Sequence, residues 1–149
     1  MKTTTKWQEL STSSHYQTAV AVEEALERGD IADAKAGIQE LIDALSRSEK
    51  RALRSQLIRL MMHIIKWKTQ PERRTISWCV SISNARREID DIQEDTPSLT
   101  RAVINGLWEK CFRAAKTEAE IEMGKKSAVA KLSWAQVFEH EYEMNGSKG

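Results

Sequence analysis

The sequence has 149 residues, of which 40% are hydrophobic and 30% charged, and its formal net charge is +1. A chain of this length can bury a core without a metal ion or a disulfide. A net charge this close to zero does not by itself point to a nucleic acid or a membrane as partner. The chain has only 6 Gly and 2 Pro, which favours long helices and few tight turns.

The N-terminus lacks the apolar stretch of a signal peptide. No apolar run approaches the roughly 18 residues that a membrane span requires. We therefore expect a cytoplasmic protein with no membrane partner.

The first predicted elements are helices that follow a polar start. Segment 1–13 is rich in Ser and Thr and is expected to be loose. A helix is predicted over 14–28, because Gly29 is the residue type that most often follows a helix end. The next helix starts after Asp30, a capping residue, and its apolar residues recur at steps of three and four. This spacing predicts one buried stripe, formed by Ile31, Ala34, Ile38, Leu41, Ile42 and Leu45.

A third helix is predicted over 46–68, because Ser46 and Glu49 have the spacing of a capping box. Its second half is apolar on two sides, which predicts that it lies at the centre of the fold. After Pro71, a fourth helix is predicted over 72–93.

The last predicted helices follow a second strong boundary. Thr96 can cap a fifth helix, and Pro97 fits its first turn. This helix is expected to end near Gly124, and Ser133 can cap a short C-terminal helix. Segment 144–149 is expected to be a disordered tail from its composition.

The sequence contains no strand pattern and no internal repeat. The predicted fold is therefore all-α: one helical domain over 14–143, a bundle of about five main helices with a short C-terminal helix.

Cofactor and metal motifs are missing from the sequence. Cys79 and Cys111 match neither a metal-ligand spacing nor a disulfide framework, and we expect both to be small buried hydrophobes. His15, His63 and His140 lie far apart in the sequence and form no zinc motif. We predict no metal and no cofactor.

The stretch HIIKWKTQPERRTISW, residues 63–78, holds the densest group of chemically active residue types. His63 can act as an acid or base near neutral pH. Lys66, Arg73 and Arg74 carry charge that can stabilise a phosphate-like transition state. These four are the candidate catalytic residues of a metal-independent enzyme that processes nucleic acid. A histidine at the edge of an apolar face is more often a hydrogen-bonded packing residue, so the pattern leaves both interpretations open.

The same stretch also fits an architectural or binding role. Trp67 and Trp78 flank the proline turn and can clamp two helices together, with Gln70 and Glu72 beside the turn. Either arginine of the turn can bond the carbonyls left open at a helix end.

The predicted third helix also carries a basic face. Its members, Arg47, Lys50, Arg51 and Arg54, are candidates for binding a phosphate backbone. Segment 9–45 is mainly acidic, so packing of the acidic and basic helices would cancel these fields.

Two stretches resemble a bacterial family described as domain of unknown function 29. They are LIDALSRSEKRALRSQLIRLMMHIIKWKTQPERRTISW and RREIDDIQEDTPSL, within residues 38–101 or so. The resemblance is carried by a Ser-Glu-Lys-Arg helix start, a Leu-rich run, His and then Lys-Trp, Gln-Pro-Glu-Arg-Arg, a Trp, Arg-Glu-Ile and Pro-Ser-Leu. Both ends depart from the family pattern: EALERGD keeps only an echo of its Leu-Arg-x-Gly-like turn, and KLSWAQVFEHEY replaces its Cys-Pro-Tyr segment. The resemblance implies an all-α fold, and it implies no particular activity because the family has none assigned.

Taken together, the sequence favours a non-catalytic helical module that binds another protein or a copy of itself, such as an accessory or antitoxin-like partner. Two alternatives stay open. One is the nucleic-acid-processing enzyme built on His63, and the other is nucleic-acid binding through the basic helix 46–68.

Overall fold

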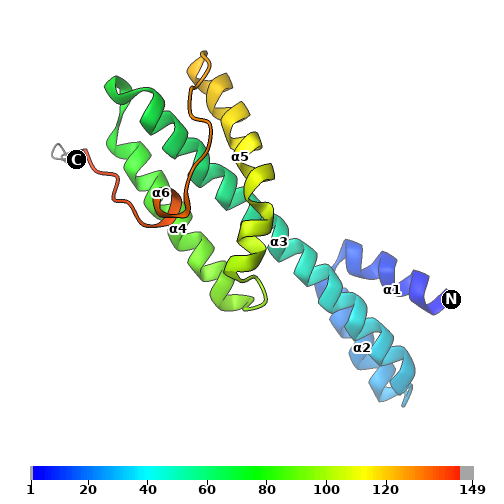
Figure 1. The fold of residues 1–149 in the computed structure, drawn as a ribbon. Helices are drawn as coiled ribbons and strands as arrows, with labels where there is room; N and C mark the ends of the chain where they lie inside the picture. The colour runs from blue at the N-terminus through cyan, green and yellow to red at the C-terminus, as the bar shows by residue number, and fades with distance from the viewer. Residues whose placement is uncertain (1, 145–149) are drawn as a thin grey trace. The chain divides into compact units, whose positions relative to one another are not determined.

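The computed structural model describes residues 2–144, with side chains from residue 6 onward. It contains α1 (Lys2–Ser13), α2 (His15–Glu27), α3 (Ile31–Thr69), the short 3-10 helix η1 (Pro71–Arg73), α4 (Ile76–Asp95), α5 (Arg101–Met123) and α6 (Trp134–Phe138) (Figure 1). No strand occurs in residues 2–144, which confirms the predicted all-α fold with five longer helices and a short C-terminal one. Apart from Met144, the tail expected over 144–149 lies outside the described residues.

The chain divides into two compact units, Met1–Lys50 and Arg51–Gly149, where the sequence predicted one domain over 14–143. Each unit contains part of the long helix α3. None of the helices between residues 2 and 144 has the length and apolar character needed to cross a membrane.

The first unit contains a helix, α1, where the sequence analysis expected a loose segment over 1–13. Trp7 anchors this helix: it is only 1% exposed, and its indole nitrogen donates to Asp33 Oδ1 at 2.8 Å. Its ring lies against Gly37 of α3, where a Cβ atom would stand 2.7 Å from the ring carbon Cη2. The expectation of a loose segment is wrong because one buried aromatic residue ties down a helix that its polar composition does not suggest.

The predicted boundaries around α2 are confirmed. The Ser14 side chain accepts from the backbone N–H of Gln17 at the start of α2. Gly29 follows the helix with a φ of 80°, a conformation that only glycine adopts without strain. Asp30 caps α3, because its carboxylate accepts from the backbone N–H of Asp33 at 3.1 Å.

Helix α3 runs without a break through Ser46 and Glu49, so the capping box predicted there is wrong. No Pro or Gly occurs between residues 38 and 69, and both capping residue types are tolerated inside a helix. The tendency of neighbouring turns to continue outweighs a local cap signal when nothing forces the chain to leave the helix.

The stripe predicted to be buried on the first half of α3 is largely exposed. Ala34 is buried, but Ile31 and Ile42 are each 53% exposed, and Ile38 and Leu45 are each 42% exposed. Helices α1 and α2 pack on another side of α3, where Ala34 and Val22 join Trp7 in a small core. The periodicity therefore identified the apolar face of the helix correctly, but the prediction that this face is buried is largely wrong.

The second unit is centred on the second half of α3, as the sequence predicted. Its buried residues there have no exposed surface: Leu53, Leu57, Leu60, Met61, Ile64 and Ile65. Residues of α4, α5 and α6 pack around them in one core, and Figure 1 shows α4 and α5 running along this part of α3. A helix that is covered on both sides needs apolar residues on both sides.

The predicted start of the fifth helix at Pro97 is wrong. Thr96 instead ends α4, and Pro97 lies in the turn that follows. Helix α5 begins at Arg101, after Thr100, whose side chain accepts from the backbone N–H of Val103. Two capping residues of similar strength lie four positions apart here, and the sequence alone favoured the first.

The remaining boundaries are close to the prediction. Helix α4 begins at Ile76, later than the expected 72–93, because η1 occupies the first residues after Gln70. Gly124 ends α5 with a left-handed conformation, and Ser133 forms a complete capping box with Gln136 at the start of α6.

Candidate functional site

The candidate site is the turn that joins α3 to α4 in the second unit. Helix α3 ends at Thr69, η1 follows with Pro71 in its first turn, and Thr75 caps α4 by accepting from the backbone N–H of Trp78. Gln70, between the helices, is only 7% exposed. The local sequence thus provides a helix end, a proline turn and a new helix start within a few residues.

Arg74 closes the end of α3. Its Nε donates to the backbone carbonyl of Trp67 at 2.9 Å, and its guanidinium carbon lies 4.5 Å from the centroid of the Trp67 ring. Trp67 is itself buried, and its ring forms a T-shaped contact with that of Tyr142 at a centroid distance of 5.8 Å. The sequence left open which arginine of the turn bonds the carbonyls at the end of the helix. Arg74 does so, because it donates to the Trp67 carbonyl.

Lys66 also contacts groups of the fold itself. Its ammonium group lies 2.7 Å from Glu122 Oε1 of α5 and 5.0 Å from the centroid of the Trp78 ring of α4. Its side chain is only 12% exposed. Lys66 thus links three helices, with an ion pair on one side and a cation–π contact on the other.

His63 lies half-buried on α3, one turn before Lys66. Its Nδ1 is 3.0 Å from the carbonyl oxygen of Arg59. Because a carbonyl can only accept, Nδ1 carries the proton of this bond, and in the neutral ring Nε2 is left as the acceptor. Burial lowers the pKa of His63 from its ordinary value, the bond to Arg59 opposes this, and the positive charges of Lys66 and Arg59 lower the pKa further. The neutral imidazole is therefore favoured at neutral pH.

A surface hollow of about 370 Å³ lies beside His63. Its lining comes from α3 and α5 and consists of Ser55, Ile58, Arg59, Met62, His63 and Glu118. The sequence analysis did not find Ser55 or Glu118 as neighbours of His63. Glu118 follows His63 by many residues in the chain, and no local pattern signals that α5 returns to this point.

Two of the four candidate catalytic residues, Lys66 and Arg74, have their direct contacts with other groups of the fold. Within the described part of the chain, no hydrogen bond or ion pair joins His63 to Lys66, Arg73 or Arg74. Arg73 is exposed, and so is Glu72 beside it. The structure instead joins Arg74 to Trp67 and Lys66 to Trp78.

The residues of the predicted basic face point mainly into solvent. Arg47, Lys50 and Arg51 are exposed, and Arg54 is half-buried. Burial raises the pKa of the nearby Cys111 thiol, and the positive charge of Arg54 opposes this. None of the four forms an ion pair with another described residue.

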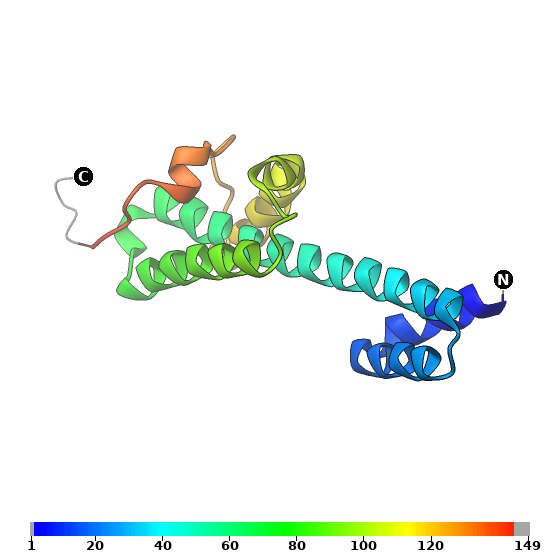
Figure 2. The same cartoon turned by 90° about the horizontal axis from the view of Figure 1, so that it is seen from below.

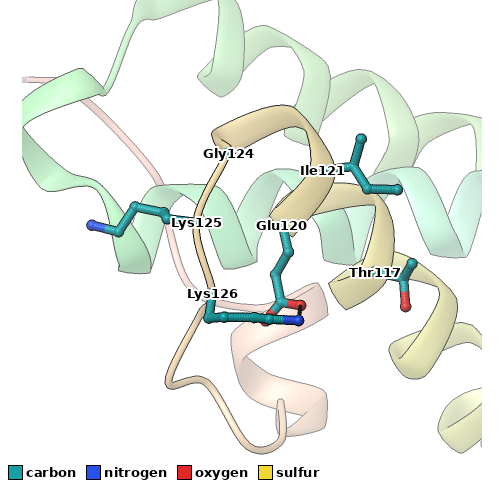
Figure 3. A pocket seen from close by; sticks show the side chains of 6 residues that line it. All are labelled: Thr117, Glu120, Ile121, Gly124, Lys125 and Lys126. Atoms are coloured by element: carbon teal, nitrogen blue, oxygen red, sulfur yellow. Dashed lines mark ion pairs between the residues drawn. The ribbon is translucent and has the colours of Figure 1, made fainter.

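A larger hollow, of about 460 Å³, lies at the end of α5 (Figure 3). In Figure 3 the side chain of Lys126 lies beside Glu120, whereas Lys125 extends away from it. Glu120 accepts from the backbone N–H of Ser127 at 2.8 Å, and its other oxygen is 3.9 Å from Lys126 Nζ. The Ser127 hydroxyl lies 2.8 Å from that of Thr69, so this carboxylate and its neighbours fix the loop after α5 against the end of α3.

A third hollow, of about 300 Å³, lies between α4, α5 and α6 and contains two arginines. Arg86 donates through Nε to the carbonyl of Val137 at 2.8 Å, and the Arg101 guanidinium stacks 3.9 Å from the centroid of the Trp134 ring. Both cations hold the short helix α6 in place, with the carbonyl of Val137 bonded and Trp134 covered.

No cluster suited to a metal ion occurs among residues 2–144, since nowhere do three or more His, Cys, Asp or Glu side chains converge. Cys111 is buried as the sequence predicted, whereas Cys79 is only partly buried.

The fold and the turn define an all-α protein in which Lys66, near the end of α3, and Arg74, in the turn before α4, contact groups of the fold itself. The chain belongs to the family described as Domain of unknown function DUF29, whose model matches residues 12–143. This match includes both ends that seemed to depart from the family pattern in the sequence. Neither a curated protein nor a solved structure matches the chain significantly.

Proposed function

We propose that this chain is a non-catalytic helical module that binds a protein, as an accessory or antitoxin-like partner would. The observation that carries the proposal is the apolar face of α3 in the first unit. Ile31, Ile38, Ile42 and Leu45 are each between 42% and 53% exposed on one side of this helix.

Exposed large apolar residues are common singly, but a contiguous row on one helix face is a frequent mark of a binding surface. Ile38, Ile42 and Leu45 follow one another at about one helical turn, and Ile31 lies about two turns before Ile38 on the same face of α3. A partner helix that covers the row would remove its side chains from water, at roughly 25 cal/mol for each Å² of apolar surface.

The candidate catalytic residues support the same proposal. Two of the four, Lys66 and Arg74, are bound to groups of the fold itself. A charge that acts on a transition state must be available to it, and these two are held by Glu122 and Trp67.

An enzyme that uses His63 is the second candidate function, because His63 has a lowered pKa and lines a hollow with Glu118 and Ser55. Nucleic-acid binding through Arg47, Lys50 and Arg51 is a third, since these side chains are exposed and outside ion pairs with other described residues. Binding of this third kind must weaken steeply as salt rises.

The test is native co-purification of the tagged chain, with and without nuclease, using two variants. Ile42→Asp places a charge in the apolar row, and Ala32→Asp places the same charge at an exposed position on another side of α3. We expect a stoichiometric protein that survives nuclease, is lost with Ile42→Asp and is kept with Ala32→Asp.

Retention of that protein by Ile42→Asp would contradict the role of the apolar row. A nuclease-sensitive nucleic-acid signal would favour the basic residues. Turnover of a nucleic-acid substrate that His63→Ala abolishes would favour the enzyme.

A further inference from the structure

The exposed face of α3 has a regular repeat that includes two charged residues. Starting at Ile31, the positions on this face follow at steps of four, three, four, three and four residues. We call this row the α3 seam; it consists of Ile31, Lys35, Ile38, Ile42, Leu45 and Glu49. Alternating steps of three and four place all six residues on one side of a helix, in the spacing of a coiled-coil contact.

The α3 seam lies wholly within the first unit, and its apolar members are uncovered there. Its neighbours on the inner side of α3, Ala34, Gly37 and Ala44, face the small core or are otherwise buried. Figure 2 shows α2 along one side of this part of α3. The α3 seam therefore lies on another side of the helix, and its residues have the spacing needed to pack against a further helix.

We propose that the α3 seam packs against the same seam of a second copy of this chain, with the two α3 helices antiparallel. This inference rests on the proposed function and names its partner. A two-fold axis makes the surface complementary to itself, as most soluble homodimers require.

The two charged residues of the seam decide whether the paired helices run parallel or antiparallel. In a parallel pair, Lys35 would face Lys35 and Glu49 would face Glu49, and such like-charge contacts in a seam are destabilising. In an antiparallel pair in which Ile38 packs on Ile42 of the second copy, Lys35 lies opposite Leu45. Glu49 of the second copy is then one turn further along, about 6 Å away on the helix axis.

That distance is within reach of a lysine side chain, which can lay its methylene groups over an apolar neighbour and place its ammonium group beyond. The symmetry of the pair forms this contact twice. The apolar residues at the centre of the seam therefore meet one another, while each end is closed by a Lys35–Glu49 pair.

The test is sedimentation equilibrium of the whole chain at several concentrations and at low salt. We expect the weight-average mass to rise from that of the 17.0 kDa monomer towards twice that value with concentration. Ile42→Asp should stay monomeric throughout, and Ala32→Asp should behave as the unaltered chain. Circular dichroism checks that both variants keep their helix content.

Charge reversal tests the direction of the pair. Lys35→Glu alone, or Glu49→Lys alone, converts both attractive contacts into repulsive ones and should weaken dimerisation about tenfold. The double variant Lys35→Glu with Glu49→Lys restores both contacts and should recover most of the lost affinity. High salt should reduce the difference between the single and double variants.

The outcomes separate this inference from the proposed function. A monomer at every concentration overturns the self-pairing, while a protein partner that Ile42→Asp releases would still support the binding module. Dimerisation that the double variant fails to recover overturns the antiparallel arrangement. Dimerisation that survives Ile42→Asp overturns the α3 seam as the contact.

Discussion

Replacing Arg74 by Ala tests whether the turn between α3 and α4 is structural. Arg74→Ala removes the donor that binds the Trp67 carbonyl at 2.9 Å and the cation that stacks on its ring at 4.5 Å. A hydrogen bond made by a charged group contributes about 1.5–3 kcal/mol. A cation–π contact adds about 0.5–1 kcal/mol at a partly exposed site. Because the two terms share one side chain, we expect a loss of about 2–3 kcal/mol in the free energy of unfolding.

The measurement is equilibrium unfolding in urea, followed by circular dichroism and by tryptophan fluorescence. A domain of this size is stabilised by about 5–15 kcal/mol, so a loss of this magnitude shifts the urea midpoint clearly. Arg73→Ala is the matched control, because Arg73 is the adjacent arginine and is exposed. It should change stability by less than about 0.5 kcal/mol. Arg74→Lys keeps the charge but loses the planar donor, and should fall between the two.

Equal losses from Arg73→Ala and Arg74→Ala would refute the reasoning, because they would show that charge rather than the Trp67 contact matters. A loss below about 0.5 kcal/mol for Arg74→Ala would have the same force. Such a small loss would mean that the Arg74 guanidinium is available for a ligand, and Arg74 would again be a candidate for catalysis.

Further predictions concern packing and protonation. Trp67→Ala should cost roughly 3–5 kcal/mol in urea unfolding, and Trp78→Ala less, because Trp67 is 6% exposed and Trp78 is only half-buried; equal losses would contradict this ranking. Gly37→Ala should destabilise the chain by about 1–3 kcal/mol, since its Cβ would stand 2.7 Å from an indole ring. Gly106→Ala, with nothing within 4 Å of its Cβ, should stabilise α5 by about 0.5–1 kcal/mol, and a loss of stability there would count against the helix geometry. His63 should titrate below 6.5 by NMR, because burial lowers its pKa. The unfolded chain then binds the proton more readily than the folded chain, so the contribution of His63 to the free energy of unfolding falls as the pH drops below about 6.5. His63→Gln should remove this contribution to the pH dependence of stability. A contribution of His63 that instead rises as the pH drops would contradict the lowered pKa.

The joint between α3 and α4 was largely predictable because its determinants are local. Pro71 ends one helix, Thr75 starts the next, and an arginine a few residues beyond a helix end can reach back to its last carbonyls. The sequence could not decide which arginine does so. Arg73 lies in η1 and is exposed, whereas Arg74 follows it and reaches Trp67.

Helix α1 could not be predicted, because its anchor depends on a distant residue. The polar residues before Ser14 indicate a loose segment on composition alone. What holds the helix is the burial of Trp7 against Gly37 and its bond to Asp33, 26 positions away in the sequence. The only local signal was a single tryptophan in a polar segment, and a periodicity search gives one residue no weight.

The apolar stripe of α3 shows a different limit of sequence reasoning. Spacing tells which residues share a face, but not what covers that face. The residues before Ser46 and those after Arg51 have the same kind of periodicity. The later ones are buried by α4 and α5, whereas Ile31, Ile38 and Ile42 are left largely exposed. Only the positions of the other helices distinguish an internal stripe from an external one.

This contrast also bears on where the function lies. The Lys-Trp and Gln-Pro-Glu-Arg-Arg residues that carry the family resemblance belong to the second unit, where Lys66, Trp67 and Arg74 fasten helices together. Residues that fasten helices together serve the fold, and a fold does not by itself determine what a protein binds. The apolar row of α3 lies in the first unit, and its residues lie outside the small core in which α1 and α2 pack on another side of α3. Large apolar side chains that stay about half exposed cost solubility, and a binding surface is a frequent reason for them. Changes in the turn should therefore alter stability first, and changes in the row should alter association first.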